Sequence, residues 1–281
     1  MESLIPNPDW RPWRVFGKAA DVSAIEPGTF EVHAEGLAFG CELIPNTGAD
    51  RLIVVLYPGS PYPRFYDLPP REGCHQLRIS DPSAPLTDVG LSCYIGMERQ
   101  DPIQGILQIT ARVRECLKVS PDRVIYFGMS GGGFAALMCA IHDTNAIAVG
   151  LNPQVRLVAF AGNSAFEKLA QAFRKGGSIR QLSEEYAERF SVIEALGAAH
   201  RAGKSPRLIL STNRDSEWDI KNQHEPFCRA FGIPLQGGKD ISEDLEATTF
   251  FAEGGHNVFF GSRDVLGEAL RSLSSASQVE A

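Results

Sequence analysis

The chain of 281 residues lacks the features that mark several classes of protein. No apolar run reaches the roughly 18 residues needed to cross a bilayer, so we expect no membrane span. The first ten residues have neither a basic start nor a continuous apolar core, and no signal peptide is predicted. The net charge is -7, which argues against nucleic acid or an anionic membrane surface as the main partner.

Motifs for cofactors and disulfides are missing as well. The sequence has no H-E-x-x-H motif, no clustered Cys/His set and no G-x-G-x-x-G after a first strand, so neither a metal nor another cofactor is predicted. The six cysteines include no C-x-x-C pair. Several of them lie in apolar segments, which favours reduced, buried thiols in a cytoplasmic protein over a disulfide framework.

What the sequence does contain is an alternation of strand-like and helical segments. Apolar runs typical of strands occur at residues 51–57, 76–79, 124–127, 146–151, 207–211 and 248–251. Helical patterns separate most of these runs, and a final one covers about residues 263–273. The alternation predicts an α/β fold with a mostly parallel central sheet and helices on both faces, in a single domain over residues 1–281.

Two segments depart from this alternation. Residues 1–30 carry four prolines and two tryptophans, and we expect an irregular arm that packs on the surface. Residues 154–205 hold two amphipathic helical patterns and no strand. This second segment is either a cap that shapes the substrate pocket or an enlarged crossover on the flank of the sheet.

The most informative motif is Gly128-Met129-Ser130-Gly131-Gly132, which lies between an apolar strand and a helix of small residues. A serine at such a strand-to-helix turn has a strained backbone and presents its hydroxyl at the end of the sheet. Side chains on the flanking positions would collide with the sharp turn, so glycine is favoured there. We therefore predict that Ser130 is a nucleophile.

A serine hydroxyl needs a base within hydrogen-bond reach and a third group that orients this base. Of six histidines, His256 suits the role best, because its Gly-Gly loop follows the last predicted strand. For the acid we favour Asp215, directly after the strand at 207–211, with Asp219 one helical turn later as the alternative and Glu217 as a third choice. Any of these three could instead cap the following helix.

The oxyanion formed during acyl transfer needs preformed donors. One is expected to be the backbone N–H of Gly131, at the start of the helix. The other is expected in the loop after residues 51–57, where Pro58 and Pro61 have no N–H and leave Gly59 or Ser60 as donors.

This set of residues resembles the α/β-hydrolase superfamily from about residue 50 onward, including its chain order of serine, acid and histidine. The resemblance implies that Ser130, Asp215 and His256 form a triad. The segment Tyr57-Pro58-Gly59-Ser60 departs from the His-Gly sequences of many esterases. The segments 128–134, 80–82 and 94–96 also resemble hydrolases linked to bacterial surface-polysaccharide biosynthesis.

These observations predict a serine hydrolase that cleaves a carboxylic ester of a small-molecule acyl substrate through an acyl-enzyme. Two alternatives stay open: an acyltransferase that uses the same triad with a sugar or other alcohol, and a non-catalytic, hydrolase-like binding protein. Peptidase activity uses the same constellation and stays open too, as does the oligomeric state.

Overall fold

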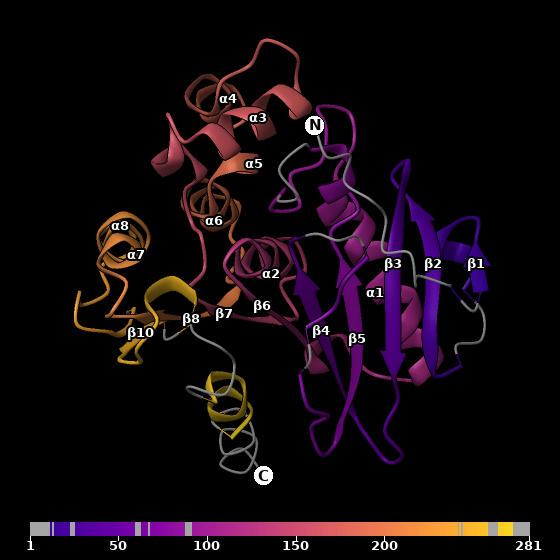
Figure 1. Ribbon diagram of the computed structural model, residues 1–281. Coiled ribbons are helices and arrows are strands. Elements are labelled where there is room, and N and C mark those ends of the chain that lie inside the picture. Colours follow the sequence, from indigo (N-terminus) through magenta and orange to yellow (C-terminus); the bar gives the residue numbers. More distant parts are fainter. Residues whose placement is uncertain are drawn as a thin grey trace.

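The structure is a computed structural model that describes residues 12, 14–22, 26–59, 63–66, 68–87, 92–240, 242, 244–257 and 264–271. Its centre is one sheet of ten strands in the order β1-β2-β3-β5-β4-β6-β7-β8-β10-β9 (Figure 1). In chain order the strands are β1 (Arg14–Phe16), β2 (Gly28–Ala34), β3 (Leu37–Ile44), β4 (Arg51–Tyr57), β5 (Cys74–Ser80), β6 (Val124–Met129), β7 (Ile147–Leu151), β8 (Arg207–Asn213), β9 (Gly238–Lys239) and β10 (Leu245–Phe250).

The sheet is parallel through its middle and at the β1–β2 edge, and it is antiparallel where β3 and β9 pair with their neighbours. Strands β5, β4, β6, β7, β8 and β10 run in one direction, whereas β3 pairs antiparallel with β2 and β5, and β9 pairs antiparallel with β10. The predicted α/β class with a mostly parallel sheet is therefore confirmed. The prediction of an irregular arm over residues 1–30 is wrong for residues 14–16, which form β1 and pair in parallel with β2.

Helices join these strands and cover the sheet. The α-helices are α1 (Pro102–Leu117), α2 (Gly131–His142), α3 (Ser164–Phe173), α4 (Ile179–Glu185), α5 (Ala187–Phe190), α6 (Val192–Arg201), α7 (Glu217–Asp219) and α8 (Glu225–Phe231). The shorter turns are η1 (Ala19–Asp21), η2 (Ala84–Leu86), η3 (Pro121–Arg123), η4 (Leu157–Phe160), the π-helical η5 (Ile220–His224) and η6 (Gly255–Asn257). Residues 265–271 are helical as well.

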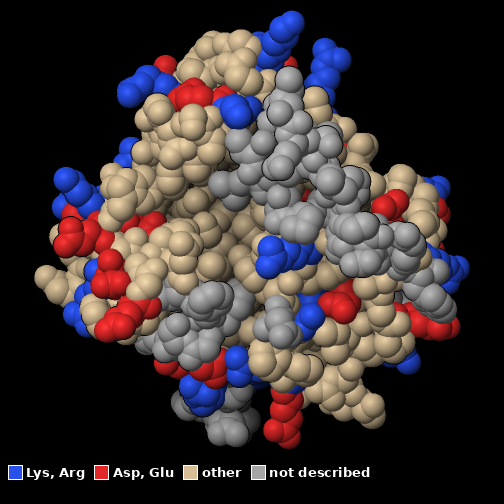
Figure 2. Space-filling view, in the orientation of Figure 1, with Lys and Arg blue, Asp and Glu red and all other residues tan. Residues whose placement is uncertain are grey.

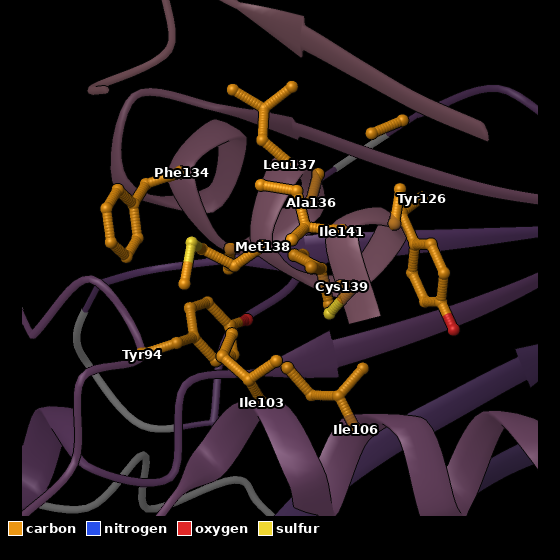
Figure 3. Close-up of a cluster of buried hydrophobic side chains, with 14 of the residues drawn as sticks. Tyr94, Ile103, Ile106, Tyr126, Phe134, Ala136, Leu137, Met138, Cys139 and Ile141 are labelled. Atoms are coloured by element: carbon orange, nitrogen blue, oxygen red, sulfur yellow. The ribbon is translucent and has the colours of Figure 1, made fainter. Parts of the chain in front are cut away.

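Alternate residues of the central strands enter two separate cores. Val54 and Tyr126 join a large cluster with α1, α2 and α6 on one face of the sheet. Val55 and Phe127 join a smaller cluster on the other face, which the helix at residues 265–271 covers. In Figure 3 the larger cluster is drawn where α2 meets Ile103 of α1. Because both faces of the sheet are covered, the side chains on both sides of strands β4 and β6 are apolar, and their sequences are continuous apolar runs.

The segment between β7 and β8 divides into two parts. Helix α6 packs on α2, as a crossover helix does, whereas α3, α4 and α5 lie at the top of the molecule in Figure 1, away from the sheet. The Arg189 guanidinium of α5 donates hydrogen bonds to the carbonyl oxygens of Ile95, Met97, Glu98 and Gln100. These contacts fasten the helical segment to the loop at residues 92–100.

Charged side chains gather mostly toward the outline of the face drawn in Figure 2, and the hollow near its middle is lined mostly by uncharged residues, with a Lys or Arg side chain beside it. Five of the six cysteines are buried, as predicted, and all six have free thiols. Among the described residues, no helix is long and apolar enough to span a membrane.

Candidate active site

Ser130 occupies a sharp turn between β6 and α2, with φ 55° and ψ -121°. Close packing requires the glycines on either side of it. A Cβ atom on Gly128 would lie 2.3 Å from the Gly132 carbonyl carbon, and one on Gly132 would lie 2.3 Å from the Leu56 carbonyl oxygen. Helix α2 can start this close to the sheet only without these side chains, and the strained serine is thereby held at the carboxyl end of β6.

His256 reaches Ser130 from the loop after β10. Its Nε2 lies 2.8 Å from the Ser130 Oγ, across 126 residues of sequence. The histidine belongs to the short turn η6 and is partly exposed. The structure therefore brings together the two residues predicted as nucleophile and base, at a distance that permits direct proton transfer.

The carboxylate at His256 belongs to Asp219, and the expectation that Asp215 orients the histidine is wrong. The Asp219 Oδ2 lies 2.6 Å from the His256 Nδ1 and also accepts a hydrogen bond of 2.6 Å from the Ser216 hydroxyl. Asp219 is 1% exposed. A carboxylate buried to this degree needs such partners, because desolvation without them is costly.

Asp215 has a different role in the same region. Its exposed carboxylate accepts hydrogen bonds from the backbone N–H groups of Gly254 (3.1 Å) and Gly255 (2.8 Å). It therefore fastens the loop that carries His256. Glu217, the third candidate acid, begins α7 and is exposed.

Two buried asparagines, which no sequence motif marks, hold the same loop. The Asn213 Nδ2 donates to the carbonyl oxygens of Ala252 (2.7 Å) and Gly255 (2.8 Å). The Asn152 Nδ2 donates to the His256 carbonyl oxygen (2.9 Å), and its Oδ1 accepts from the Asn213 N–H (2.7 Å). Asn213 ends β8 and Asn152 directly follows β7. A polar residue at the end of an apolar strand is the sequence feature that could have identified each of them as a site residue.

Of the predicted oxyanion donors, the structure describes Gly131 and Gly59. Gly131 is the first residue of α2, where a backbone N–H has no partner within the helix. Gly59 is half-buried, in the loop after β4. Pro58 lies next to Gly131, since a Cβ on that glycine would be 3.1 Å from the Pro58 Cβ. Ser60 lies outside the residues that the structure describes.

One further side chain touches the nucleophile. The Gln154 Nε2 lies 3.3 Å from the Ser130 Oγ, and the Gln154 Oε1 accepts a hydrogen bond of 3.1 Å from the Cys93 thiol. The backbone N–H of Gln154 also donates to the Ser130 carbonyl oxygen (3.2 Å). No sequence pattern marks Gln154, because it follows β7 in a loop without a motif.

A buried carboxylate supports the loop that contains Cys93. Asp81 is fully buried and accepts hydrogen bonds from the Ser83 hydroxyl (2.6 Å), the Ser92 hydroxyl and the Tyr94 N–H (2.6 Å). Burial raises the pKa of the Asp81 carboxyl to about 6, while these donors favour its charged form. Cys93 and Tyr94 both have positive φ angles, 50° and 55°, so this carboxylate fixes a strained turn.

The site thus contains a hydrogen-bonded chain of Ser130, His256 and Asp219. Such a chain can activate a hydroxyl for attack on an electrophilic carbon, because the imidazole takes up the proton and the carboxylate stabilises the resulting cation. Within the described ranges, no group of three or more His, Cys, Asp or Glu side chains is arranged to hold a metal ion.

Solved structures share this architecture at low sequence identity. The capsule O-acetyltransferase of Neisseria meningitidis serogroup A has a TM-score of 0.55 and 14% identity, over 88% of this chain and 96% of that one. The S-formylglutathione hydrolase of Staphylococcus aureus has a TM-score of 0.55 and 12% identity, over 82% and 91% of the two chains.

A peptidase shares only part of its length with this chain. The acylaminoacyl peptidase of Pyrococcus horikoshii has a TM-score of 0.53 and 16% identity, over 83% of this chain but 38% of its own. No protein-family model and no curated protein sequence matches this chain significantly. The structural matches confirm the predicted α/β-hydrolase fold.

Proposed function

We propose that the protein is a serine hydrolase that cleaves a carboxylic ester through an acyl-enzyme intermediate. The observation that carries the proposal is the pair of contacts made by His256: 2.8 Å to the Ser130 hydroxyl and 2.6 Å to the Asp219 carboxylate. In this proposal Ser130 is the nucleophile, His256 the general base and Asp219 the orienting acid.

In the first half of the reaction, the Ser130 Oγ attacks the acyl carbon and its proton moves to the His256 Nε2. The carbonyl oxygen becomes an oxyanion, for which the Gly131 N–H and a donor from Gly59 or Ser60 are the candidate partners. Collapse of this intermediate re-forms the carbonyl group and breaks the bond to the leaving alkoxide, which takes the proton from His256. Water then repeats the sequence and releases the acid.

The test is labelling with a fluorophosphonate probe, followed by peptide mass mapping. We expect label on Ser130 in the wild type, none in Ser130→Ala, and strongly slowed labelling in His256→Ala. Hydrolysis of p-nitrophenyl acetate should follow the same order. A folded wild-type protein that takes up no label would overturn the proposal in favour of a non-catalytic binding protein.

A second candidate is an acyltransferase that passes the acyl group from Ser130 to a sugar or another alcohol. One observation favours it: the meningococcal capsule O-acetyltransferase matches this chain over nearly the full length of both, and a further structure of that enzyme contains CoA. Exclusion of water from the acyl-enzyme by the segment at residues 154–205 would favour this reaction further.

The two candidates differ in their products. Incubation of the acetylated enzyme with increasing concentrations of an alcohol or sugar acceptor separates them by mass spectrometry. A hydrolase releases acetate at a rate that does not depend on the acceptor. An acyltransferase forms the acetyl ester of the acceptor in preference to acetate.

A further inference from the structure

The contact between Gln154 and Ser130 has no role in the chain from serine to acid. Gln154 lies just after β7 and is 4% exposed. Its Nε2 lies 3.3 Å from the Ser130 Oγ, and this is the one hydrogen bond of that nitrogen within the described part of the chain. A carboxamide nitrogen has two N–H groups. Besides the N–H that points at the Ser130 Oγ, Gln154 therefore has a second N–H that can donate to a group bound there.

The orientation of this amide is fixed from its other end. The Cys93 thiol donates to the Gln154 Oε1 at 3.1 Å, so the NH2 group faces Ser130. Cys93 is fully buried, and a Cβ on Gly131 would lie 2.8 Å from its sulfur. The thiol is thus wedged between the first residue of α2 and the glutamine.

The loop that carries Cys93 is held rigidly. The next residue, Tyr94, donates its N–H to Asp81, and its hydroxyl oxygen lies 2.8 Å from the Tyr57 carbonyl oxygen and 2.6 Å from the Ile79 carbonyl oxygen, to one of which it donates its single proton. The Tyr94 ring packs near Met138 of α2 and Ile103 of α1 (Figure 3). Cys93 therefore has little freedom to move away from the glutamine, and the amide keeps its direction.

We propose that Gln154 is a further catalytic residue, whose side-chain N–H donates to the oxyanion on the acyl group bound to Ser130. This inference rests on the proposed function. As the bond from Oγ to the acyl carbon forms, the carbonyl π electrons move onto the oxygen and the serine proton moves to His256. The oxyanion shares its carbon with Oγ and forms next to it, and we assign to it the second N–H of the amide that now contacts Oγ. Cys93 is a positioning residue in this arrangement.

The experiment replaces the amide with a thioether of similar size. Gln154→Met should lower kcat for p-nitrophenyl acetate about 100-fold, with KM within about twofold, since the lost donor acts mainly in the transition state. Inhibition by a trifluoromethyl ketone, which forms a charged adduct with the serine, should weaken by a similar factor. Gln108→Met, the same exchange at an exposed position of α1, is the matched control and should keep the wild-type kcat.

A second pair of variants tests the orientation of the amide. Cys93→Ser keeps a donor for the Gln154 Oε1, and Cys93→Ala removes it. We expect kcat to fall more in the alanine variant than in the serine variant, with the pH dependence of kcat unchanged in both. Thermal unfolding shows which variants are folded. If Gln154→Met does not fold, Gln154→Glu is the second variant that removes the N–H donor.

The outcomes separate this inference from the proposed function. A wild-type protein without fluorophosphonate label on Ser130 overturns both. A labelled wild type, together with a folded Gln154→Met variant that keeps kcat within about twofold, overturns the role of Gln154 alone. A loss of kcat without weaker ketone inhibition would also overturn it, because an oxyanion donor must affect both.

Discussion

The His256 imidazole is held by Asp219, at 2.6 Å, and not by Asp215, which lies four residues earlier in the chain. Both carboxylates serve the same histidine in different ways. Asp219 is buried and contacts the ring, whereas Asp215 is exposed and binds the backbone of the loop at Gly254 and Gly255. The segment that follows β8 therefore orients the His256 ring through Asp219 and holds the loop of His256 through Asp215.

This division predicts unequal effects of two matched substitutions. Asp219→Asn should lower kcat for an ester substrate by about 10³- to 10⁴-fold, since an amide cannot stabilise the imidazolium and favours the wrong tautomer. Asp215→Asn keeps an oxygen that can accept from the loop N–H groups and should lower kcat less than about tenfold. Steady-state kinetics of the two variants check the assignment, and a larger loss in Asp215→Asn would contradict it.

The asparagine that ends β8 has a structural role in the same loop. Asn213 donates to Ala252 and Gly255 and accepts from the N–H groups of Ala252 and Asp215, while fully buried. Asn213→Ala leaves these backbone groups without partners, so we expect the free energy of unfolding to fall by about 2–4 kcal/mol. Urea denaturation measures the change.

A control for this substitution is available nearby. Asn222→Ala removes one side-chain hydrogen bond, to the Trp218 carbonyl oxygen, at a site near the surface. It should cost less than about 1 kcal/mol. Equal losses in the two variants would show that the network around the His256 loop contributes nothing special.

The sequence was sufficient to predict those parts of the fold and site that local patterns determine. The apolar run at residues 124–127, the glycines around Ser130 and the loop of His256 each carry their signal within a few residues. The acid was predicted one helical turn too early, because sequence spacing does not say whether it lies in the turn after β8 or in the first helical turn beyond it. A π-helical turn follows Asp219 directly, and no pattern indicated it.

Contacts between distant segments account for what the sequence did not reveal. Cys93 contacts Gln154, which lies 61 residues later in the chain, and Asp81 contacts Tyr94, which lies 13 residues later. The residue types involved are common in cores and loops, so the sequence does not mark them.

Two local features also lack a sequence pattern. Strand β1 has three residues, too few for a periodic pattern to predict it. The strained turn at Cys93 and Tyr94 contains no glycine, so the usual marker of a positive φ angle is missing.

The buried carboxyl of Asp81 predicts a pH-dependent stability. Its pKa is about 6 in the folded chain against 3.8 as the ordinary value, so the folded state binds this proton more tightly. The resulting stabilisation is complete below about pH 4 and is lost as the pH rises toward 6, a change of about 3 kcal/mol for this group. Carbon-13 NMR of the Asp81 carboxyl, assigned by its loss in Asp81→Asn, should give a midpoint near pH 6. A midpoint at or below pH 4 would mean that the surrounding donors outweigh burial.

Two glycine-to-alanine substitutions should have opposite effects on stability. In Gly132→Ala the new methyl group would lie 2.3 Å from the Leu56 carbonyl oxygen, which belongs to a central strand and cannot move without disturbing the sheet. We expect a loss of about 2–4 kcal/mol and a displaced Ser130. In Gly197→Ala, within α6, the nearest atom is 3.4 Å away at the flexible end of Arg201. Alanine should therefore stabilise the helix by about 0.5–1 kcal/mol. Thermal unfolding of both variants measures the difference, and a stable, active Gly132→Ala would mean that α2 does not need to approach the sheet this closely.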